Sequence, residues 1–121
     1  MGLFSFNKNK SQLKWNNIST ENELHHFLNE VEQPVVFFKH STRCSISSMA
    51  LNRLESEWNL DESACTLVFI DVIASRPISN LLSEITGIEH QSPQLILWKS
   101  GEVLYTASHS EIRFETIASL I

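Results

Sequence analysis

The chain has 121 residues, 42% of them hydrophobic, which is enough for one compact domain with a core of its own. Its net charge of −5 argues against a nucleic-acid surface, and no stretch approaches the roughly 18 apolar residues that a membrane span needs. Two cysteines without a C-x-x-C pair or a zinc-ligand cluster argue against a disulfide framework and favour a reducing compartment. We therefore expect a cytoplasmic protein that binds neither nucleic acid nor membranes.

A polar, lysine-bearing start is followed by apolar runs that alternate with stretches of helical periodicity. Residues 1–14 predict a flexible N-terminal arm, and residues 15–121 predict one domain. The runs that predict strands are 15–18, 35–39, 66–72, 94–98 and 102–107. The periodic stretches that predict helices are 20–31, 45–58, 77–86 and 108–121. The apolar face of the helix at 45–58 carries Ile46, Met49, Ala50, Leu54 and Trp58.

Capping and turn signals mark several boundaries between these elements. Two residue pairs have the form of a capping box: Thr20 with Glu23, and Ser108 with Glu111. Gly87 is a typical helix end, and Ser100-Gly101 is a hairpin turn signal. Helices that alternate with strands give parallel strands, whereas the closing hairpin gives antiparallel ones. The expected fold is therefore α/β, a mixed sheet with helices on both faces.

Cys44 follows the apolar strand at 35–39 and a short polar loop, at the expected start of the next helix. A helix N-terminus has unpaired N–H groups and partial positive charge, which favour the thiolate, and Arg43 adds a cation. Position 47, where a dithiol oxidoreductase carries its second cysteine, is a serine. A redox cycle would therefore pass through a mixed disulfide with a substrate or a small thiol. We predict that Cys44 is a nucleophile rather than a buried structural thiol.

Cys65 precedes the strand at 66–72, which should run parallel to the strand at 35–39. It would then lie at the end of the sheet opposite Cys44. A five-residue strand spans about 16 Å, whereas a disulfide needs Cα atoms within about 7 Å. We therefore expect Cys65 to be a packed thiol that cannot resolve a disulfide on Cys44.

The element order, the cysteine after the second strand, and Ser92-Pro93 ahead of a hairpin resemble the thioredoxin superfamily. Over residues 15–121 the chain resembles the monothiol bacilliredoxins, small cytoplasmic proteins of low-GC Gram-positive bacteria. The segments that carry this resemblance are Phe37-Phe38-Lys39-His40-Ser41, Cys44-x-Ile46-Ser47, Ser75-Arg76-Pro77 with Ser79-Asn80, Ser92-Pro93-Gln94 and Ala107-Ser108-His109-Ser110. The family motif Thr-Cys-Pro-Ile-Ser differs here, because Arg43 precedes the cysteine and Ser45 follows it.

The resemblance implies a thioredoxin-like fold and the removal of bacillithiol from S-bacillithiolated proteins. Cys44 would take bacillithiol as a mixed disulfide, and bacillithiol or a partner reductase would regenerate the thiol. Bacillithiol is then a co-substrate, with no bound cofactor or metal. The resemblance also implies a cis Ser92–Pro93 bond that turns the Ser92 backbone toward an extended substrate. We expect a monomer.

Five further side chains are candidates for the site, each against a plainer interpretation as a solvated surface group. Ser47 could donate a hydrogen bond to the Cys44 thiolate from one helical turn along. His40 and His109 could bind an anion or transfer a proton. Arg43 and Arg76 could bind the malate carboxylates of bacillithiol through their guanidinium donors.

Two other functions are open alternatives. One is a non-catalytic thioredoxin-like adaptor or binding module, whose sheet edge and Pro93 loop bind a partner without turnover. The other is iron–sulfur carriage, as in monothiol glutaredoxins, although the chain lacks their Cys-Gly-Phe-Ser motif.

Overall fold

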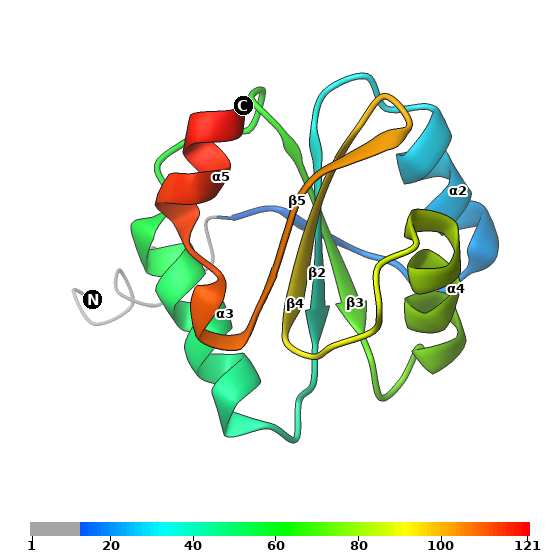
Figure 1. The fold of residues 1–121 in the computed structure, drawn as a ribbon, viewed down its shortest axis with the longest axis horizontal. Coiled ribbons are helices and arrows are strands. Elements are labelled where there is room, and N and C mark those ends of the chain that lie inside the picture. The colour runs from blue at the N-terminus through cyan, green and yellow to red at the C-terminus, as the bar shows by residue number, and fades with distance from the viewer. Residues whose placement is uncertain (1–12) are drawn as a thin grey trace, which may run out of the picture.

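The structure, a computed structural model, describes residues 13–121 as a five-stranded mixed sheet with helices on both faces (Figure 1). The strands are β1 (Trp15–Asn17), β2 (Val35–His40), β3 (Thr66–Asp71), β4 (Gln94–Lys99) and β5 (Glu102–Ser108). The helices are α2 (Glu21–Asn29), α3 (Ser45–Glu57), α4 (Arg76–Thr86) and α5 (Phe114–Leu120), with a 3-10 turn, η1 (His109–Glu111). The mixed α/β architecture expected from the sequence is confirmed.

The strands lie in the order β1-β3-β2-β4-β5. β1, β3 and β2 are parallel, whereas β4 is antiparallel to both β2 and β5. The ends of β2, β3 and β5 and the start of β4 therefore meet at one edge of the sheet, here called the C-terminal edge. Its register pairs are His40 with Asp71, Lys39 with Gln94, and Gln94 with Ser108. Ligand sites in α/β sheets form at such an edge.

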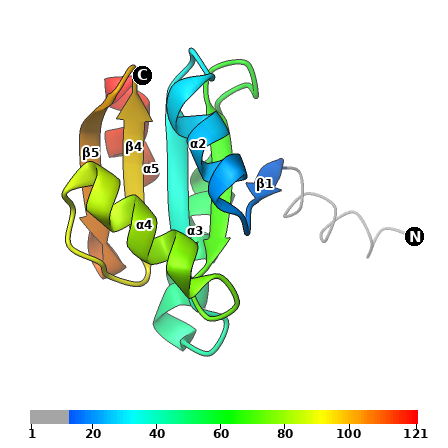
Figure 2. The same cartoon turned by 90° about the vertical axis from the view of Figure 1, so that its right-hand side faces the viewer.

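Two layers of helices cover the sheet, with α3 and α5 on one face and α2 and α4 on the other (Figures 1 and 2). Successive residues of β2 point to opposite faces. Val36 and Phe38 pack in the cluster that includes Leu54 of α3, and Val35 and Phe37 pack in the cluster that includes residues of α2 and α4. All six residues of β2 are buried, which confirms the prediction of a strand covered on both faces.

Most of the capping and turn features predicted from the sequence are present in the structure. The Thr20 backbone N–H donates to Glu23 Oε1 at 3.1 Å and the Glu23 backbone N–H donates to Thr20 Oγ1 at 3.2 Å, which completes the capping box. Gly87 ends α4 with a φ of 75°. The Ser92–Pro93 peptide bond is cis, as the family resemblance implied.

The capping box predicted at Ser108 is wrong. Ser108 makes no side-chain cap, η1 forms there instead, and α5 begins only at Phe114. The reason is His109, whose φ of 56° is left-handed and cannot continue a right-handed helix. Arg53 from α3 also binds the carbonyl oxygens of His109 and Ile112, which holds this turn in place.

The predicted apolar face of α3 divides into a buried and an exposed part. Ala50 and Leu54 are buried, whereas the side chains of Ile46 and Met49 are 54% and 64% exposed. Ser47 and Ala50, in the same turns, are buried, so Ile46 and Met49 are exposed because they lie on a side of α3 that the core does not cover. The apolar pattern is therefore wider than the face that the core requires.

The flexible arm expected at residues 1–14 lies mostly outside the described residues. At the start of the described chain, Leu13 packs against a core cluster and Lys14 Nζ lies 3.4 Å from Glu62 Oε2. No helix within residues 13–121 has the length and apolar character that crossing a membrane requires.

Candidate active site

Cys44 is the N-cap residue of α3 and lies at the C-terminal edge, four residues after β2. Its backbone N–H donates to Ser41 O at 3.2 Å, and its carbonyl accepts from the Ser48 N–H at 3.2 Å. The thiol is free, partly exposed and makes no capping hydrogen bond. The sulfur is therefore available to a substrate at the positive end of the helix, the position predicted from the sequence.

Cys65 lies at the opposite edge of the sheet, next to Thr66, which pairs with Val35 at the start of β2. It is buried, and burial raises the pKa of its thiol to about 11. The six residues of β2 separate the two ends by about 17 Å, well beyond the roughly 7 Å that a disulfide allows between Cα atoms. Both cysteines are free, so Cys65 cannot resolve a disulfide on Cys44 without large rearrangement.

Ser47 and His40 hold the loop before Cys44. Ser47 is buried, and its Oγ accepts from the Ser41 N–H at 3.1 Å and lies 2.7 Å from His40 Nδ1. Burial lowers the pKa of His40, although the Asp71 carboxylate acts in the opposite direction. The Nδ1 atom of a neutral ring can accept a hydrogen bond from the Ser47 hydroxyl. Ser41, Ser47 and His40 are then joined in one chain of hydrogen bonds. Both side chains thus lie beneath the loop, and in this arrangement the single Ser47 proton is directed to His40 rather than, as the sequence suggested, to the Cys44 thiolate.

The cis peptide at Ser92–Pro93 lies at the same edge. Pro93 is buried, and its carbonyl accepts from the His109 N–H at 3.1 Å. Gln94, the next residue, pairs with Lys39 of β2. Ser92 Oγ is buried without a hydrogen-bond partner. The loop that precedes β4 is therefore joined both to the central strand and to η1.

A buried polar network that the sequence analysis did not assign supports this loop from the α4 side. Lys39 is fully buried in β2, and its Nζ donates to Ser83 Oγ at 2.7 Å and lies 3.2 Å from His90 Nδ1. Ser79 Oγ also lies 3.2 Å from His90 Nδ1. Burial lowers the pKa of Lys39 to about 8, and the nearby Arg76 guanidinium adds to this. The signal in the sequence was a lysine inside an apolar strand, but its partners are 44 and 51 residues away.

The remaining predicted side chains are open to solvent at the C-terminal edge. Arg43 is exposed on the loop beside Cys44, and His109 is exposed in η1. Arg76 begins α4, and its Nε donates to Asn80 Oδ1 at 3.3 Å. The structure thus brings all the predicted site residues to one edge: His40, Arg43, Cys44, Ser47, Arg76, Ser92, Pro93 and His109.

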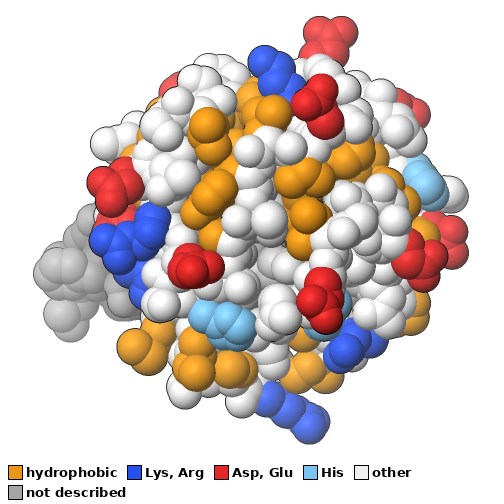
Figure 3. All heavy atoms as spheres, in the orientation of Figure 1, with side chains coloured by type: hydrophobic (Ala, Val, Ile, Leu, Met, Phe, Trp, Pro, Cys, Tyr) orange, Lys and Arg blue, Asp and Glu red, His pale blue; other side chains and the backbone are white. Residues whose placement is uncertain are grey.

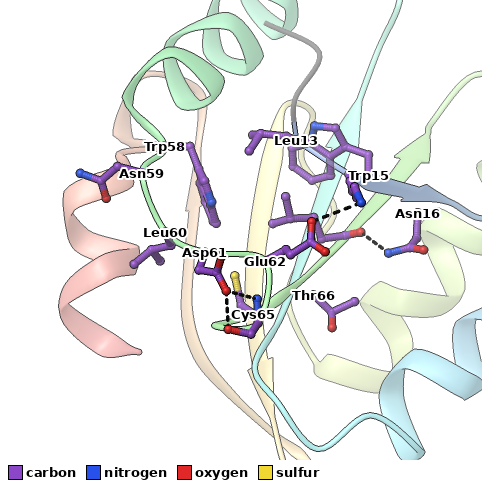
Figure 4. Close-up of a pocket in the computed structure, with 13 residues that line it drawn as sticks. Leu13, Trp15, Asn16, Trp58, Asn59, Leu60, Asp61, Glu62, Cys65 and Thr66 are labelled. Atoms are coloured by element: carbon purple, nitrogen blue, oxygen red, sulfur yellow. Dashed lines mark hydrogen bonds and ion pairs between the residues drawn. The ribbon is translucent and has the colours of Figure 1, made fainter. Parts of the chain in front are cut away.

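Two hollows in the surface lie at opposite ends of the sheet. The larger, of about 930 Å³, is bordered by Trp15, Trp58 and Cys65 (Figure 4). The smaller, of about 110 Å³, lies on the Cys44 side between α3 and η1. The smaller hollow is bordered by residues of α3, the helix that Cys44 caps. Within residues 13–121, no three His, Cys, Asp or Glu side chains gather as metal ligands would.

This arrangement can perform thiol–disulfide exchange through a single sulfur. Cys44 is partly exposed at a helix N-terminus, and the exposed side chains of Arg43 and Arg76 lie at the same edge of the sheet. With no second thiol in reach, a disulfide formed at Cys44 must be released by an external thiol.

Residues 16–117 match the family described as Monothiol bacilliredoxin BrxC. Among solved structures, a protein assigned as an oxidoreductase with a thioredoxin fold is 24% identical, with a TM-score of 0.76 and 88% of this chain and 92% of that chain covered. Malassezia sympodialis thioredoxin is 14% identical, with a TM-score of 0.68 and coverage of 88% and 86%. A thioredoxin variant from Halobacterium salinarum is 14% identical, with a TM-score of 0.64 and coverage of 89% and 88%.

At these identities the solved structures show the fold alone, and they confirm the expected thioredoxin-like architecture. The family match covers most of the chain, includes Cys44 and, together with the fold, supports a redox function. The chain therefore belongs to the monothiol bacilliredoxin family, BrxC.

Proposed function

We propose that this protein is a monothiol thiol–disulfide oxidoreductase that removes bacillithiol from S-bacillithiolated proteins. The observation that carries the proposal is a free, partly exposed Cys44 at the N-cap of α3, with the other thiol buried at the opposite edge. Such a sulfur can enter an exchange reaction but cannot close an internal disulfide. A monothiol cycle on a mixed disulfide with a small thiol fits this geometry.

In the first step the Cys44 thiolate attacks the bacillithiol sulfur of the mixed disulfide. The bond between that sulfur and the client sulfur breaks, and the client leaves as a thiolate that takes a proton from water. A disulfide between Cys44 and bacillithiol forms in its place. A second bacillithiol thiolate then attacks the bacillithiol sulfur, which gives bacillithiol disulfide and returns the Cys44 thiolate.

The surrounding residues support each partner of this reaction. The α3 N-terminus favours the Cys44 thiolate both before attack and as the leaving group of the second step. Arg43 and Arg76 are exposed at the same edge as Cys44, and their guanidinium groups suit the malate carboxylates of bacillithiol. The Ser92 backbone beside the cis bond suits an extended client segment.

The proposal is tested by intact-mass spectrometry after incubation with a bacillithiolated client protein. We expect the wild type to gain one bacillithiol while the client loses it. The Cys44→Ala variant should gain none and leave the client modified, whereas Cys65→Ala should behave as the wild type. Bacillithiol found on the Cys44→Ala variant would contradict the assignment of Cys44. A client that binds the wild type but keeps its modification would favour the adaptor function instead.

A further inference from the structure

Ile46 and Met49 form an exposed apolar pair on the first turns of α3, directly after Cys44. Their side chains are 54% and 64% exposed. The space-filling view shows hydrophobic side chains gathered with a histidine and a basic group at this end of the molecule, the lower edge of Figure 3. The core does not use this pair, because the buried face of α3 consists of Ser47, Ala50 and Leu54. Grouped exposed apolar side chains of this kind typically mark a binding surface.

The pair borders the small hollow between α3 and η1, here called the α3 cup. The cup has a volume of about 110 Å³ and is lined by Ile46, Met49, Ala50, Arg53, His109 and Ser110. A cavity of about 150 Å³ holds a benzene molecule, so a hollow of this size suits one branched aliphatic side chain. The lining residues carry no acidic side chain, and exposed Arg43 lies on the loop before Cys44.

The walls of the α3 cup are held together before any partner binds. Arg53 Nη2 donates to Ile112 O at 3.2 Å and to His109 O at 3.4 Å, which fixes η1 against α3. The His109 N–H donates to Pro93 O at 3.1 Å, which fixes the same turn to the cis-proline loop. A preformed hollow gives more affinity than one that must be ordered on binding.

The position of the cup relative to Cys44 determines which atoms of a client reach it. Each helical residue rises 1.5 Å, so Ile46 and Met49 lie about 3 Å and 8 Å along α3 from Cys44. Attack at a disulfide sulfur aligns three sulfurs, which brings the client sulfur within about 5 Å of Cys44 Sγ. In an extended chain, side chains two residues apart lie on one face at about 7 Å. A client side chain two positions from the modified cysteine therefore reaches the cup.

We propose that the α3 cup binds one aliphatic side chain of the client protein, two residues from its bacillithiolated cysteine, and thereby selects clients. The inference rests on the proposed function, since the exchange reaction is what holds the client sulfur beside Cys44. The occupant is a client segment with Leu, Ile or Met at that position. Acidic residues flanking it are favoured, because Arg53 lines the cup and no acidic side chain does.

The test uses bacillithiolated peptides that are identical except for Leu or Ser two residues before or after the cysteine. We expect one Leu peptide to have a KM about tenfold lower than its Ser counterpart with the wild type, the usual discrimination of a small apolar pocket. With Met49→Ser this ratio should fall to about one. Ile85→Ser, at a 39% exposed position on α4 that does not line the cup, is the matched control and should keep the ratio.

A mixed disulfide of bacillithiol with a small thiol, which cannot reach the cup, separates the two proposals. If the wild type reduces this substrate and all peptides with equal KM, the inference is wrong and the proposed function stands. If Met49→Ser keeps the preference for Leu, the cup is not its origin and the inference is likewise overturned. If no bacillithiol mixed disulfide is reduced, the proposed function and the inference both fail.

Discussion

Cys44 and Cys65 have the same side chain but lie at opposite ends of the sheet, and these ends differ in the polarity of their buried side chains. The polar or charged side chains that are buried among the described residues all lie at or beside the C-terminal edge with Cys44: Lys39, His40, Ser47, Ser75, Ser79 and Gln94. Cys65 instead packs in an apolar cluster at the opposite edge. Buried polar groups destabilise a fold unless they are hydrogen-bonded. The protein therefore confines this cost to the edge where its chemistry would take place, and surroundings rather than residue type separate the reactive thiol from the inert one.

The largest expected difference between the two ends is in thiol reactivity. Since burial raises the pKa of Cys65 to about 11, only about one thiol in ten thousand is ionised at pH 7. We expect iodoacetamide to alkylate Cys44 at least about a thousand times faster than Cys65 in the folded protein. Peptide mapping after timed alkylation measures both rates, and Cys44→Ala isolates the slow one. Similar alkylation rates at Cys44 and Cys65 would show that their surroundings do not make the two thiols differ in reactivity.

The next difference is in stability. A serine hydroxyl at position 65 would be buried among apolar groups, so Cys65→Ser should lower the free energy of unfolding by about 2 kcal/mol. Cys44→Ser places the hydroxyl at a partly exposed N-cap, where it can cap α3, so no loss and a gain of up to about 1 kcal/mol are expected. Urea unfolding of both variants gives the two values. A larger loss for Cys44→Ser would mean that its thiol has a structural role.

Within the Cys44 end, Ser47 tests whether the buried hydrogen bonds hold the loop. Ser47→Ala removes the acceptor of the Ser41 N–H and the partner of His40, which should lower the free energy of unfolding by about 1.5 kcal/mol. The kcat/KM for a bacillithiolated client should fall with it, because the loop carries Cys44. Ser45→Ala, at an exposed neighbouring position, is the control and should change stability by less than about 0.5 kcal/mol.

The smallest effect concerns Lys39 and depends on pH. Folding lowers the pKa of Lys39 from its ordinary 10.5 to about 8, so between these values the unfolded chain binds a proton that the folded chain has released. Stability must then rise with pH in this window, by about 1 kcal/mol from pH 8 to 9 relative to Lys39→Met, in which this titration is absent. Below pH 8 the difference between wild type and variant should level off.

Chemical unfolding at several pH values measures that difference. Lys99→Met, at an exposed position in β4, is the matched control and should keep the pH dependence of the wild type. The prediction is contradicted if the free energy of unfolding of the wild type, relative to that of Lys39→Met, falls as pH rises. Such a fall would show that folding favours the charged lysine.

Several features were predictable because they depend on neighbours in the chain. The capping box at Thr20 involves residues three apart, and the left-handed end of α4 needs only Gly87. The position of Cys44 at a helix start follows from an apolar strand, a polar loop and a periodic segment in succession. The cis bond at Pro93 came from the family resemblance rather than from local chemistry.

What could not be predicted depends on contacts between distant residues. Arg53 binds the carbonyl of His109 from 56 residues away, which helps hold η1 where a capping box was expected. Met49 is exposed although Ala50 beside it is buried, because the packing of the layers decides which side of α3 the core covers. Lys39 finds Ser83 and His90 only after β2, α4 and the proline loop have packed together.

The amino-acid order thus specified most of the elements, the place of Cys44 at a helix start and the absence of a second thiol at the usual spacing, because hydrogen bonds and side-chain packing within a few residues suffice for these. Packing of the finished sheet and helices decided which side chains around Cys44 are buried supports and which are open to a substrate. Burial and long-range hydrogen bonds are properties of the assembled layers, so they exist only once those layers are in contact.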